Sequence, residues 1–270
     1  MSKSIIFYTY YQSKSSDYNL NYFVKCIKYS EFIDYIIIIN GYNCNIKIPN
    51  YDNLKILKRD NIGFDTGGHK AALDTITDLN KYDYFFFLNS SVTGPFFKNK
   101  SDDKHWTHFF TEKITNDVKL VSTSICFLKQ TDKGGYGPKA EGFFCVTDLI
   151  GLKLMLNEGN IFCNHKTFED AIINGEYGKT RCMFKHNYNI DCMLQKYQNI
   201  DWRNSKNWDN NKLWYNKPAS LWPSKLNSYF NENINPYEVI FHKYYWKYNN
   251  SYISYDIIDN HIKSFDENIN

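Results

Sequence analysis

Three familiar signals are missing from this chain of 270 residues: paired cysteines, a long apolar run and a strong net charge. Its 7 cysteines include no Cys-x-x-Cys pair, which argues against a disulfide framework and against a structural zinc site. A net charge of +3 gives no reason to expect a nucleic-acid partner. We therefore expect a protein of a reducing compartment, here the cytoplasm, that does not bind nucleic acid.

Membrane and common hydrolase signals are missing as well. The apolar run at residues 35–39 is far too short to cross a bilayer, and the first residues lack the apolar core of a signal peptide. The sequence contains no Walker loop, no His-Glu-x-x-His motif and no trusted metal-ligand spacing among its histidines. We expect no transmembrane segment, and the oligomeric state stays open.

Apolar segments alternate with amphipathic ones in the first half of the chain. Strands are predicted at residues 5–11, 35–40, 54–58 and 84–88, with helices at 18–32 and 66–79. Near-continuous apolar strands between amphipathic helices are typical of a mostly parallel sheet covered on both faces. The predicted fold class is therefore α/β, and the lack of repeats or linkers predicts one domain over residues 1–270.

The second half is less regular. Helices are predicted at residues 106–114, 148–157 and 175–186, and strands at 119–125, 143–146 and 235–243. A glycine-rich loop is expected at 130–139. Irregularly spaced tryptophans between 200 and 233 can stack on sugar rings or fill a small satellite core, and the satellite core is the favoured interpretation.

A glycine-containing turn between the third strand and the next helix is the first candidate site. It reads Asn61-Ile-Gly-Phe-Asp65-Thr-Gly67-Gly68-His69. Glycines let backbone approach a ligand, and free amides at a helix start favour a diphosphate. It is not the dinucleotide Gly-x-Gly-x-x-Gly after the first strand, so a Rossmann dehydrogenase is disfavoured. The alternative is an ordinary strand–turn–helix joint in which Asp65 caps the helix.

The second candidate follows the apolar strand at 84–88. Polar residues at the carboxyl end of a parallel strand lie where α/β folds bind ligands. Asn89-Ser90-Ser91 stands where many sugar-nucleotide transferases carry an Asp-x-Asp that holds Mg²⁺ or Mn²⁺. Neutral side chains are weak metal ligands. No metal-binding residue is therefore assigned, and a requirement for Mn²⁺ or Mg²⁺ stays open.

Acidic and basic residues in the second half supply the third group. Glu176 is predicted to open a helix, which would keep its carboxylate ionised and able to act as a general base. Asp148 and Glu141 are the reserve bases, and Lys243 is a candidate phosphate partner. An acid pair at 169–170 also opens an apolar stretch and could mimic the Glu176 signal.

Taken together, five segments resemble a glycosyltransferase-like family related to rhamnan-synthesis transferases. They are Asn61-Ile-Gly-Phe-Asp-Thr-Gly-Gly, the segment 82–96 with Phe-Leu-Asn-Ser-Ser-Val-Thr-Gly-Pro-Phe, the segment 118–125, Gly175-Glu with Asn187-Tyr-Asn-Ile, and Asn235-Pro-Tyr-Glu-Val-Ile-Phe-His-Lys. The resemblance implies a GT-A-like (Rossmann-like) sheet. It divides the chain into a nucleotide-sugar-binding half, 1–125, and an acceptor and catalytic half, 126–270.

The resemblance also implies roles for individual residues. Thr9, Tyr10 and Asn40, at the first two strand ends, would seat the nucleoside. The donor sugar and diphosphate would contact the remaining residues, which are Asn61, Asp65, Gly67, Gly68, His69, Asn89, Ser90, Ser91 and Lys243. Glu176 would deprotonate a glycan or other hydroxyl acceptor in an inverting transfer from a nucleoside-diphosphate sugar, with a UDP-sugar expected.

Two rival functions remain open. A catalytically inactive nucleotide-sugar or glycan-binding protein would keep the fold and lose the chemistry, and the missing Asp-x-Asp supports it. A nucleotidyltransferase would need a basic glycine-rich loop after the first strand, and residues 10–14 contain no glycine.

Overall fold

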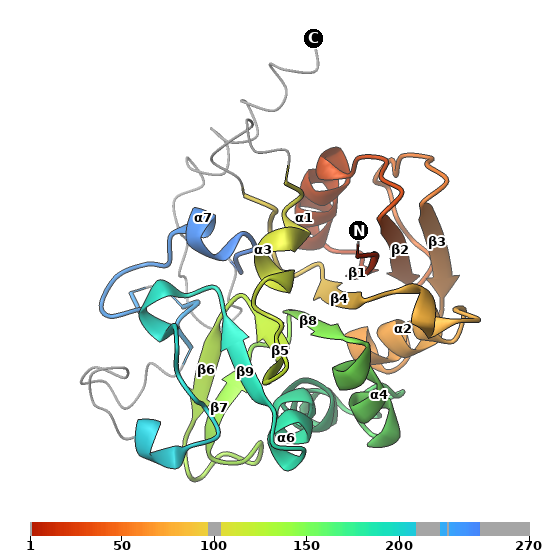
Figure 1. Cartoon of the computed structure of the whole chain (residues 1–270). Coiled ribbons are helices and arrows are strands. Elements are labelled where there is room, and N and C mark those ends of the chain that lie inside the picture. The colour runs from red at the N-terminus through yellow and green to blue at the C-terminus, as the bar shows by residue number, and fades with distance from the viewer. Residues whose placement is uncertain (1, 97–103, 209–221, 226, 244–270) are drawn as a thin grey trace.

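The computed structural model describes residues 2–96, 104–208, 222–225 and 227–243. A seven-stranded sheet with the order β3-β2-β1-β4-β8-β5-β9 runs through the middle of the molecule (Figure 1). Strand β8 is antiparallel to both of its neighbours, and all other pairs are parallel. The strands are β1 Ser4–Tyr11, β2 Ile33–Asn40, β3 Leu54–Arg59, β4 Tyr84–Asn89, β5 Val118–Ser122, β8 Phe144–Asp148 and β9 Asn189–Cys192.

Helices cover the sheet, and a two-stranded hairpin adjoins it. The hairpin pairs β6 Ile125–Leu128 with β7 Gly137–Ala140 in antiparallel fashion. The helices are α1 Lys14–Cys26, α2 Phe64–Leu73, α3 Thr107–Thr111, α4 Leu149–Asn157, α5 Phe168–Asp170, α6 Tyr177–Lys185 and α7 Pro236–Val239. The predicted α/β class, with a mostly parallel sheet flanked by helices, is confirmed. The sheet takes strands from both predicted halves, so residues 1–125 and 126–270 share one layer.

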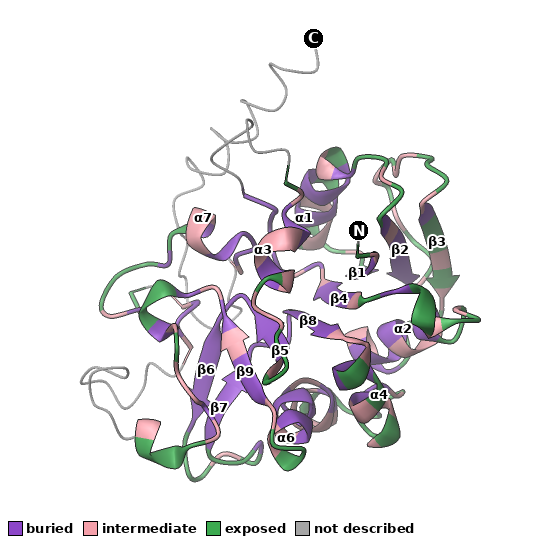
Figure 2. Ribbon diagram, viewed as in Figure 1, coloured by how far each residue is buried: buried purple, intermediate pink, exposed green. Residues whose placement is uncertain are grey.

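Alternate side chains of each central strand enter separate cores on the two faces of the sheet. Phe7 and Phe87 stack with ring centroids 5.1 Å apart on the α2 and α4 side. Tyr8 stacks on Phe23 of α1 at 4.5 Å on the other side. This alternation explains why the strands read as continuous apolar runs, and Figure 2 shows them buried under helices that expose their outer faces.

Several predicted elements differ from the structure. The expected strand 119–125 is two strands, because the chain turns at Thr123 and Ser124 into the β6–β7 hairpin. The last residues of the expected loop 130–139 belong to strand β7. The buried Lys139 ammonium donates hydrogen bonds to the backbone carbonyls of Gly135 and Tyr136, which lie just before this strand. The expected strand 235–243 begins as helix α7, with Asn235 as its N-cap, since a proline at the first helical position favours a helix start.

The ends of two helices also differ from the predicted positions. The first helix begins at Lys14 rather than 18, because the Ser13 hydroxyl accepts a hydrogen bond from the Ser16 amide. It stops at Cys26, and α2 stops at Leu73, earlier than the apolar spacing predicts. Of the tryptophans, Trp202 is fully buried, but in the main core that also contains Phe7 and Phe87 rather than in a separate satellite core, while Trp214 lies outside the described residues.

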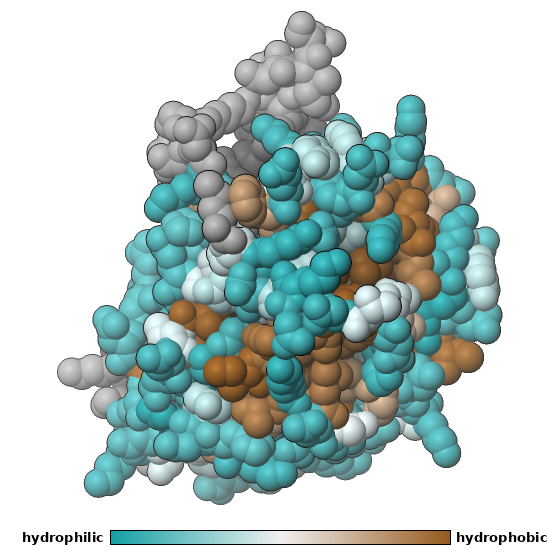
Figure 3. Space-filling view, turned by 45° about the vertical axis from the view of Figure 1, so that its right-hand side comes forward, coloured by the Kyte–Doolittle hydropathy of each residue, from teal (hydrophilic) through white to brown (hydrophobic). Residues whose placement is uncertain are grey.

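No described helix is both long enough and apolar enough to span a membrane. Apolar side chains do reach the surface, and Figure 3 shows them interrupted by hydrophilic ones on the face that it draws. Ile56 on β3 and Ile150 on α4 are each about half exposed. Scattered apolar exposure of this kind is ordinary for a folded domain.

Candidate active site

The carboxyl ends of β1 and β4 meet the start of α2, and this edge carries the first part of the site. Gly63 takes a left-handed conformation (φ 74°) and starts α2. Asp65 lies in the first turn of that helix rather than at its N-cap. Its Oδ2 accepts a hydrogen bond of 2.7 Å from the Asn89 side-chain amide at the end of β4. The two predicted segments therefore converge through a direct contact.

The polar residues at the end of β4 make hydrogen bonds within the protein. Asn89 Oδ1 already accepts hydrogen bonds from the Ser91 amide at 3.0 Å and from the Ser91 hydroxyl at 2.5 Å. Ser90 is buried, and its backbone carbonyl accepts from Asn19. Among the described residues, no group of three His, Cys, Asp or Glu ligand atoms within 4.8 Å of one another occurs at this edge. The side-chain oxygen of Asn89 is therefore engaged within the protein.

Glu176 does not open a helix, contrary to the sequence prediction. The helical segment begins eight residues earlier at α5, with Thr167 as its N-cap, and passes through π-helical turns at Ala171–Glu176 before α6. The acid pair at 169–170 therefore marks the true helix start. Wide π-type turns occur often at functional sites, because they re-aim side chains within a helix.

Burial, rather than a helix terminus, sets the charge of Glu176. A Cβ on Gly142 would lie 2.4 Å from both Cγ and Oε2 of Glu176, so its carboxylate rests against the backbone before β8. Burial, followed by the negative charge of Asp65, raises the pKa of Glu176 to about 7. The carboxylate is thus available in both protonation states near neutral pH.

Glu141 lies near Glu176 but is held differently. It is 3% exposed, and its two carboxylate oxygens accept hydrogen bonds from the hydroxyls of Ser124 and Ser224. Burial raises the pKa of Glu141 against the opposing effect of these hydrogen bonds. Each of its oxygens is therefore already engaged by a serine hydroxyl, which suits a structural role better than proton exchange with an acceptor.

Two lysines supply positive charge to the same edge. Lys243 and Lys179 both lower the pKa of Glu176, and Lys243 also lowers that of Glu141. Lys179, on α6, is 2% exposed, and its ammonium lies 5.9 Å from the centroid of the Phe162 ring. A buried ammonium without an ion-pair partner is costly unless nearby anions compensate it. The sequence analysis selected Lys243 but missed Lys179, because only the helix packing brings it here.

The predicted nucleoside residues are mostly occupied by structural contacts. The Tyr10 hydroxyl donates to Asp17 of α1, and Asn40 accepts from the Arg59 guanidinium at 2.7 Å. Thr9 is buried, and its hydroxyl has no hydrogen-bond partner among the described residues. Tyr10 therefore ties β1 to α1, and Asn40 helps to hold the turn that precedes α2.

The glycines and histidine of the α2 segment also face the protein. A Cβ on Gly68 would lie 3.0 Å from Thr9 Cγ2, and one on Gly67 would lie 2.6 Å from Asn164 Oδ1. Both glycines thus permit close packing of α2. His69 is 1% exposed, its Nε2 lies 3.1 Å from the Leu88 carbonyl, and burial lowers its pKa to about 4. The neutral imidazole is therefore buried in the core. Asn61, which precedes the glycine turn, is exposed.

Asp148 lies away from the rest of the site. It pairs in the sheet with Tyr84 at the start of β4, whereas Asn89 ends that strand. One carboxylate oxygen caps α4 through the Gly151 amide at 2.9 Å, and the other pairs with Lys119 Nζ at 2.6 Å. These contacts give Asp148 a structural role as cap and ion-pair partner.

Exposed tyrosines beside the strand ends were not selected from the sequence. Tyr11 ends β1 and is 54% exposed, and Tyr42 follows β2 and is 53% exposed. The Tyr11 ring lies 3.3 Å from the Cβ position of Gly41, so these strand ends adjoin. The available signal was the position of Tyr11 directly after Thr9 and Tyr10.

Comparisons of the chain gave structural likeness without sequence likeness. No family model matches the sequence, and no curated protein matches it, so the resemblance to the rhamnan-synthesis family stays a prediction. The fold is similar to a mannosyltransferase from Pyrobaculum calidifontis, solved with GDP-Man and Mn²⁺, at 10% identity and a TM-score of 0.45, over 71% of this chain and 54% of that one.

Two further glycosyltransferases show weaker likeness. One is GlyE of Streptococcus pneumoniae, at 13% identity and a TM-score of 0.34, over 70% of this chain and 45% of that one. The other is the catalytic domain of Drosophila β1,4-galactosyltransferase 7, solved with xylobiose. It matches at 9% identity and a TM-score of 0.37, over 73% of this chain and 66% of that one. The matched region spans about half to two thirds of these proteins. At such scores the likeness carries no argument about function, which must be argued from the site.

Proposed function

We propose that this protein transfers a sugar from a nucleoside-diphosphate donor to a hydroxyl of a glycan or similar acceptor. The observation that carries the proposal is the meeting of Glu176, Asp65 and Asn89 with two lysines at one sheet edge. That edge is where α/β folds bind ligands. A carboxylate with a pKa of about 7 beside fixed positive charge suits the activation of an alcohol.

In the proposed reaction, Glu176 accepts the proton of the acceptor hydroxyl. The acceptor oxygen attacks the anomeric carbon, the bond from that carbon to the phosphate oxygen breaks, and the nucleoside diphosphate leaves with the electron pair. One displacement of this kind inverts the anomeric centre. Asp65, fixed by Asn89, would accept hydrogen bonds from donor hydroxyls, and the exposed rings of Tyr11 and Tyr42 would flank the nucleoside.

Lysine charge, rather than a bound metal ion, is proposed to stabilise the leaving diphosphate. Lys243 and Lys179 both lie close enough to lower the pKa of Glu176, which places positive charge beside the reacting groups. Preorganised cations act strongly in a site that is partly closed to water. On this account, the neutral Asn89-Ser90-Ser91 does not need to bind Mn²⁺ or Mg²⁺.

The rival function is a binding protein that holds a nucleotide sugar without turning it over. The observation that favours it is Asn89, a neutral residue at the place of an expected metal-binding acid, whose side-chain oxygen accepts two hydrogen bonds from Ser91. The two functions differ in what Glu176 does. A binding protein has no use for a half-ionised carboxylate, whereas the transferase requires one.

A thermal-shift screen of nucleotide sugars in EDTA, repeated with Mn²⁺, tests donor binding. Ligands that bind the native state raise its midpoint by mass action, so the screen also ranks the base and the sugar. We expect a UDP- or other nucleoside-diphosphate sugar to stabilise the protein equally in both buffers, and less in a Lys243→Met variant. Stabilisation that appears only with Mn²⁺ would contradict the lysine-based site, and no stabilisation by any donor would contradict both functions.

A further inference from the structure

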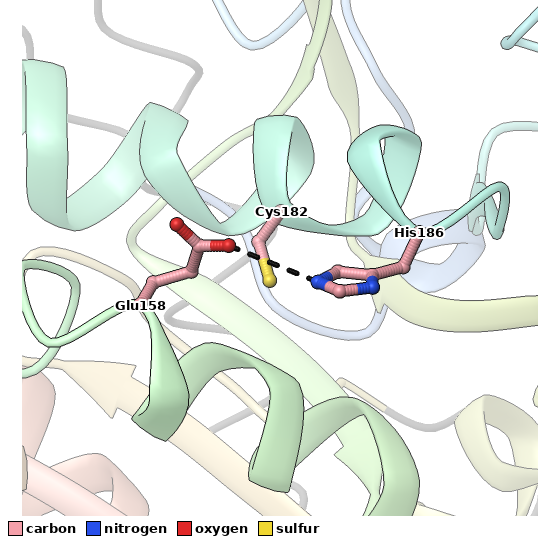
Figure 4. Close-up of side chains that lie close together, drawn as sticks. All are labelled: Glu158, Cys182 and His186. Carbon is pink, nitrogen blue, oxygen red and sulfur yellow. Dashed lines mark ion pairs between the residues drawn. The ribbon is translucent and has the colours of Figure 1, made fainter.

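A second cluster of reactive side chains lies away from the sheet edge, where α4 and α6 end. It consists of Glu158, Cys182 and His186, and one ligand atom of each lies within 4.8 Å of the others. Figure 4 shows the Glu158 carboxylate and the His186 ring directed toward each other, with the Cys182 sulfur beside the line that joins them. Within the described residues, it is the one group of three or more His, Cys, Asp or Glu that comes together so closely.

Helix geometry explains the arrangement. Cys182 and His186 are four residues apart on α6, so their side chains share one face of that helix. Glu158 is the C-cap of α4, and His186 is the C-cap of α6. The C-terminus of a helix carries partial negative charge, so two helix ends favour a cation at this place before any side chain contributes.

The side chains add to this preference. The Glu158 carboxylate already attracts a cation, because it accepts a hydrogen bond from the Lys185 ammonium. Lys185 Nζ lies 2.8 Å from Glu158 Oε1, and His186 Nε2 lies 3.8 Å from the same oxygen. The Lys185 side chain is 64% exposed, so it can swing into water when another cation arrives. The Cys182 thiol is 2% exposed and lies on the protein side of the cluster.

We propose that Glu158, Cys182 and His186 form a zinc-binding site that ties α4 to α6. Thiolate, imidazole and carboxylate together are ligands that Zn²⁺ accepts, with water in the fourth position. Bond lengths of roughly 2.0–2.3 Å separate the ligand atoms of a tetrahedral zinc by roughly 3.3–3.8 Å. The ligand atoms lie within 4.8 Å of one another, so they would have to move closer together to bind one ion.

Binding would release one proton. Zn²⁺ replaces the hydrogen of the Cys182 thiol, giving a zinc–sulfur bond and a proton in solution, with no change of oxidation state. This site is separate from the proposed transferase site and does not depend on it.

Titration of the chelator-treated protein with Co²⁺, followed by competition with Zn²⁺, tests the site. We expect one equivalent of Co²⁺ to give a near-ultraviolet thiolate-to-metal absorption band, which Zn²⁺ abolishes. His186→Ala should weaken binding at least tenfold, and Cys182→Ala should remove the band. Cys163→Ala is the matched control, because Cys163 Sγ lies 3.6 Å from a ring nitrogen of His165 but outside the cluster.

Three results of this titration would overturn the zinc site. Absence of the band in the wild-type protein would overturn the proposal, and so would a band that Cys163→Ala removes. Because Cys182 is buried, its replacement could disturb folding, so His186→Ala decides in that case: His186 is exposed, and unchanged Co²⁺ affinity in this variant would overturn the site.

Discussion

Replacing Glu176 with Gln is expected to remove sugar transfer and, at the same time, to stabilise the folded protein at neutral and alkaline pH. The two effects share one cause. Burial and the nearby charge of Asp65 disfavour the ionised carboxylate that the reaction requires. Gln keeps the shape that packs against Gly142 and cannot ionise.

The size of the stabilisation follows from linkage. The pKa of Glu176 is raised from 4.5 to about 7 in the folded protein, so the folded state binds the proton more tightly than the unfolded state. Stability from this preference is complete below pH 4.5 and is lost as the pH rises toward 7. One pKa unit is worth about 1.4 kcal/mol, so the gain of Gln above pH 7 has an upper limit of about 3.5 kcal/mol, which solvent screening lowers because the side chain is only half-buried.

Urea unfolding at several pH values measures the gain, and a pH–rate profile measures the activity. Wild-type kcat/KM should rise about tenfold between pH 6 and pH 8, because the ionised fraction of Glu176 rises from about a tenth to about nine tenths. Loss of a general base should lower kcat by roughly 10²–10⁴. Glu169→Gln is the matched control, since this exposed acid lies on the same helical segment and pairs with Lys133. Near-normal turnover in Glu176→Gln, or equal unfolding midpoints at pH 8, would refute the reasoning.

Three further substitutions separate binding, alignment and stability. Lys243→Met should raise the donor KM about tenfold in EDTA with little change in kcat, since a hydrogen bond to a charged group is worth about 1.5–3 kcal/mol. A return of the donor KM to its wild-type value on addition of Mn²⁺ would contradict the role of the lysine. Gly142→Ala should lower kcat at least tenfold, because its methyl group would lie 2.4 Å from Glu176 Oε2; unchanged kcat would show that the backbone contact is not needed. Asp148→Asn should lower the free energy of unfolding by about 2 kcal/mol through loss of the Lys119 ion pair, and should leave kcat unchanged. A hundredfold drop in kcat would show that Asp148 takes part in the reaction.

The strands of the sheet could be predicted from the sequence, because each central strand is a local run of apolar residues. Central strands such as β2 and β4 are buried on both faces and read as unbroken apolar runs, and the Asp65 and Asn89 segments follow from where such strands end. Elements with short or mixed patterns were not predictable in the same way. The strand β7 contains glycine and proline, and is a strand because it pairs with β6.

The errors at the site have a related origin. Glu176 looked like a helix start because Gly175 precedes it, yet Thr167 caps the helix and the chain passes through π-helical turns to reach Glu176. His69 looked polar and available, but α2 turns its ring into the core. Lys179 carried no local signal at all. Its relevance depends on α6 packing beside the edge that carries Asp65, which is a tertiary contact that no sequence period reports.

The central claim is most directly tested by measuring release of nucleoside diphosphate from the best-binding nucleotide sugar in EDTA, with wild-type and Glu176→Gln protein side by side. The account predicts release by the wild-type protein that increases with an added glycan acceptor, and donor binding without release by the variant. Equal release by the two proteins would contradict the role of Glu176. Donor binding with no release by either protein, across acceptors and with or without Mn²⁺, would contradict sugar transfer itself.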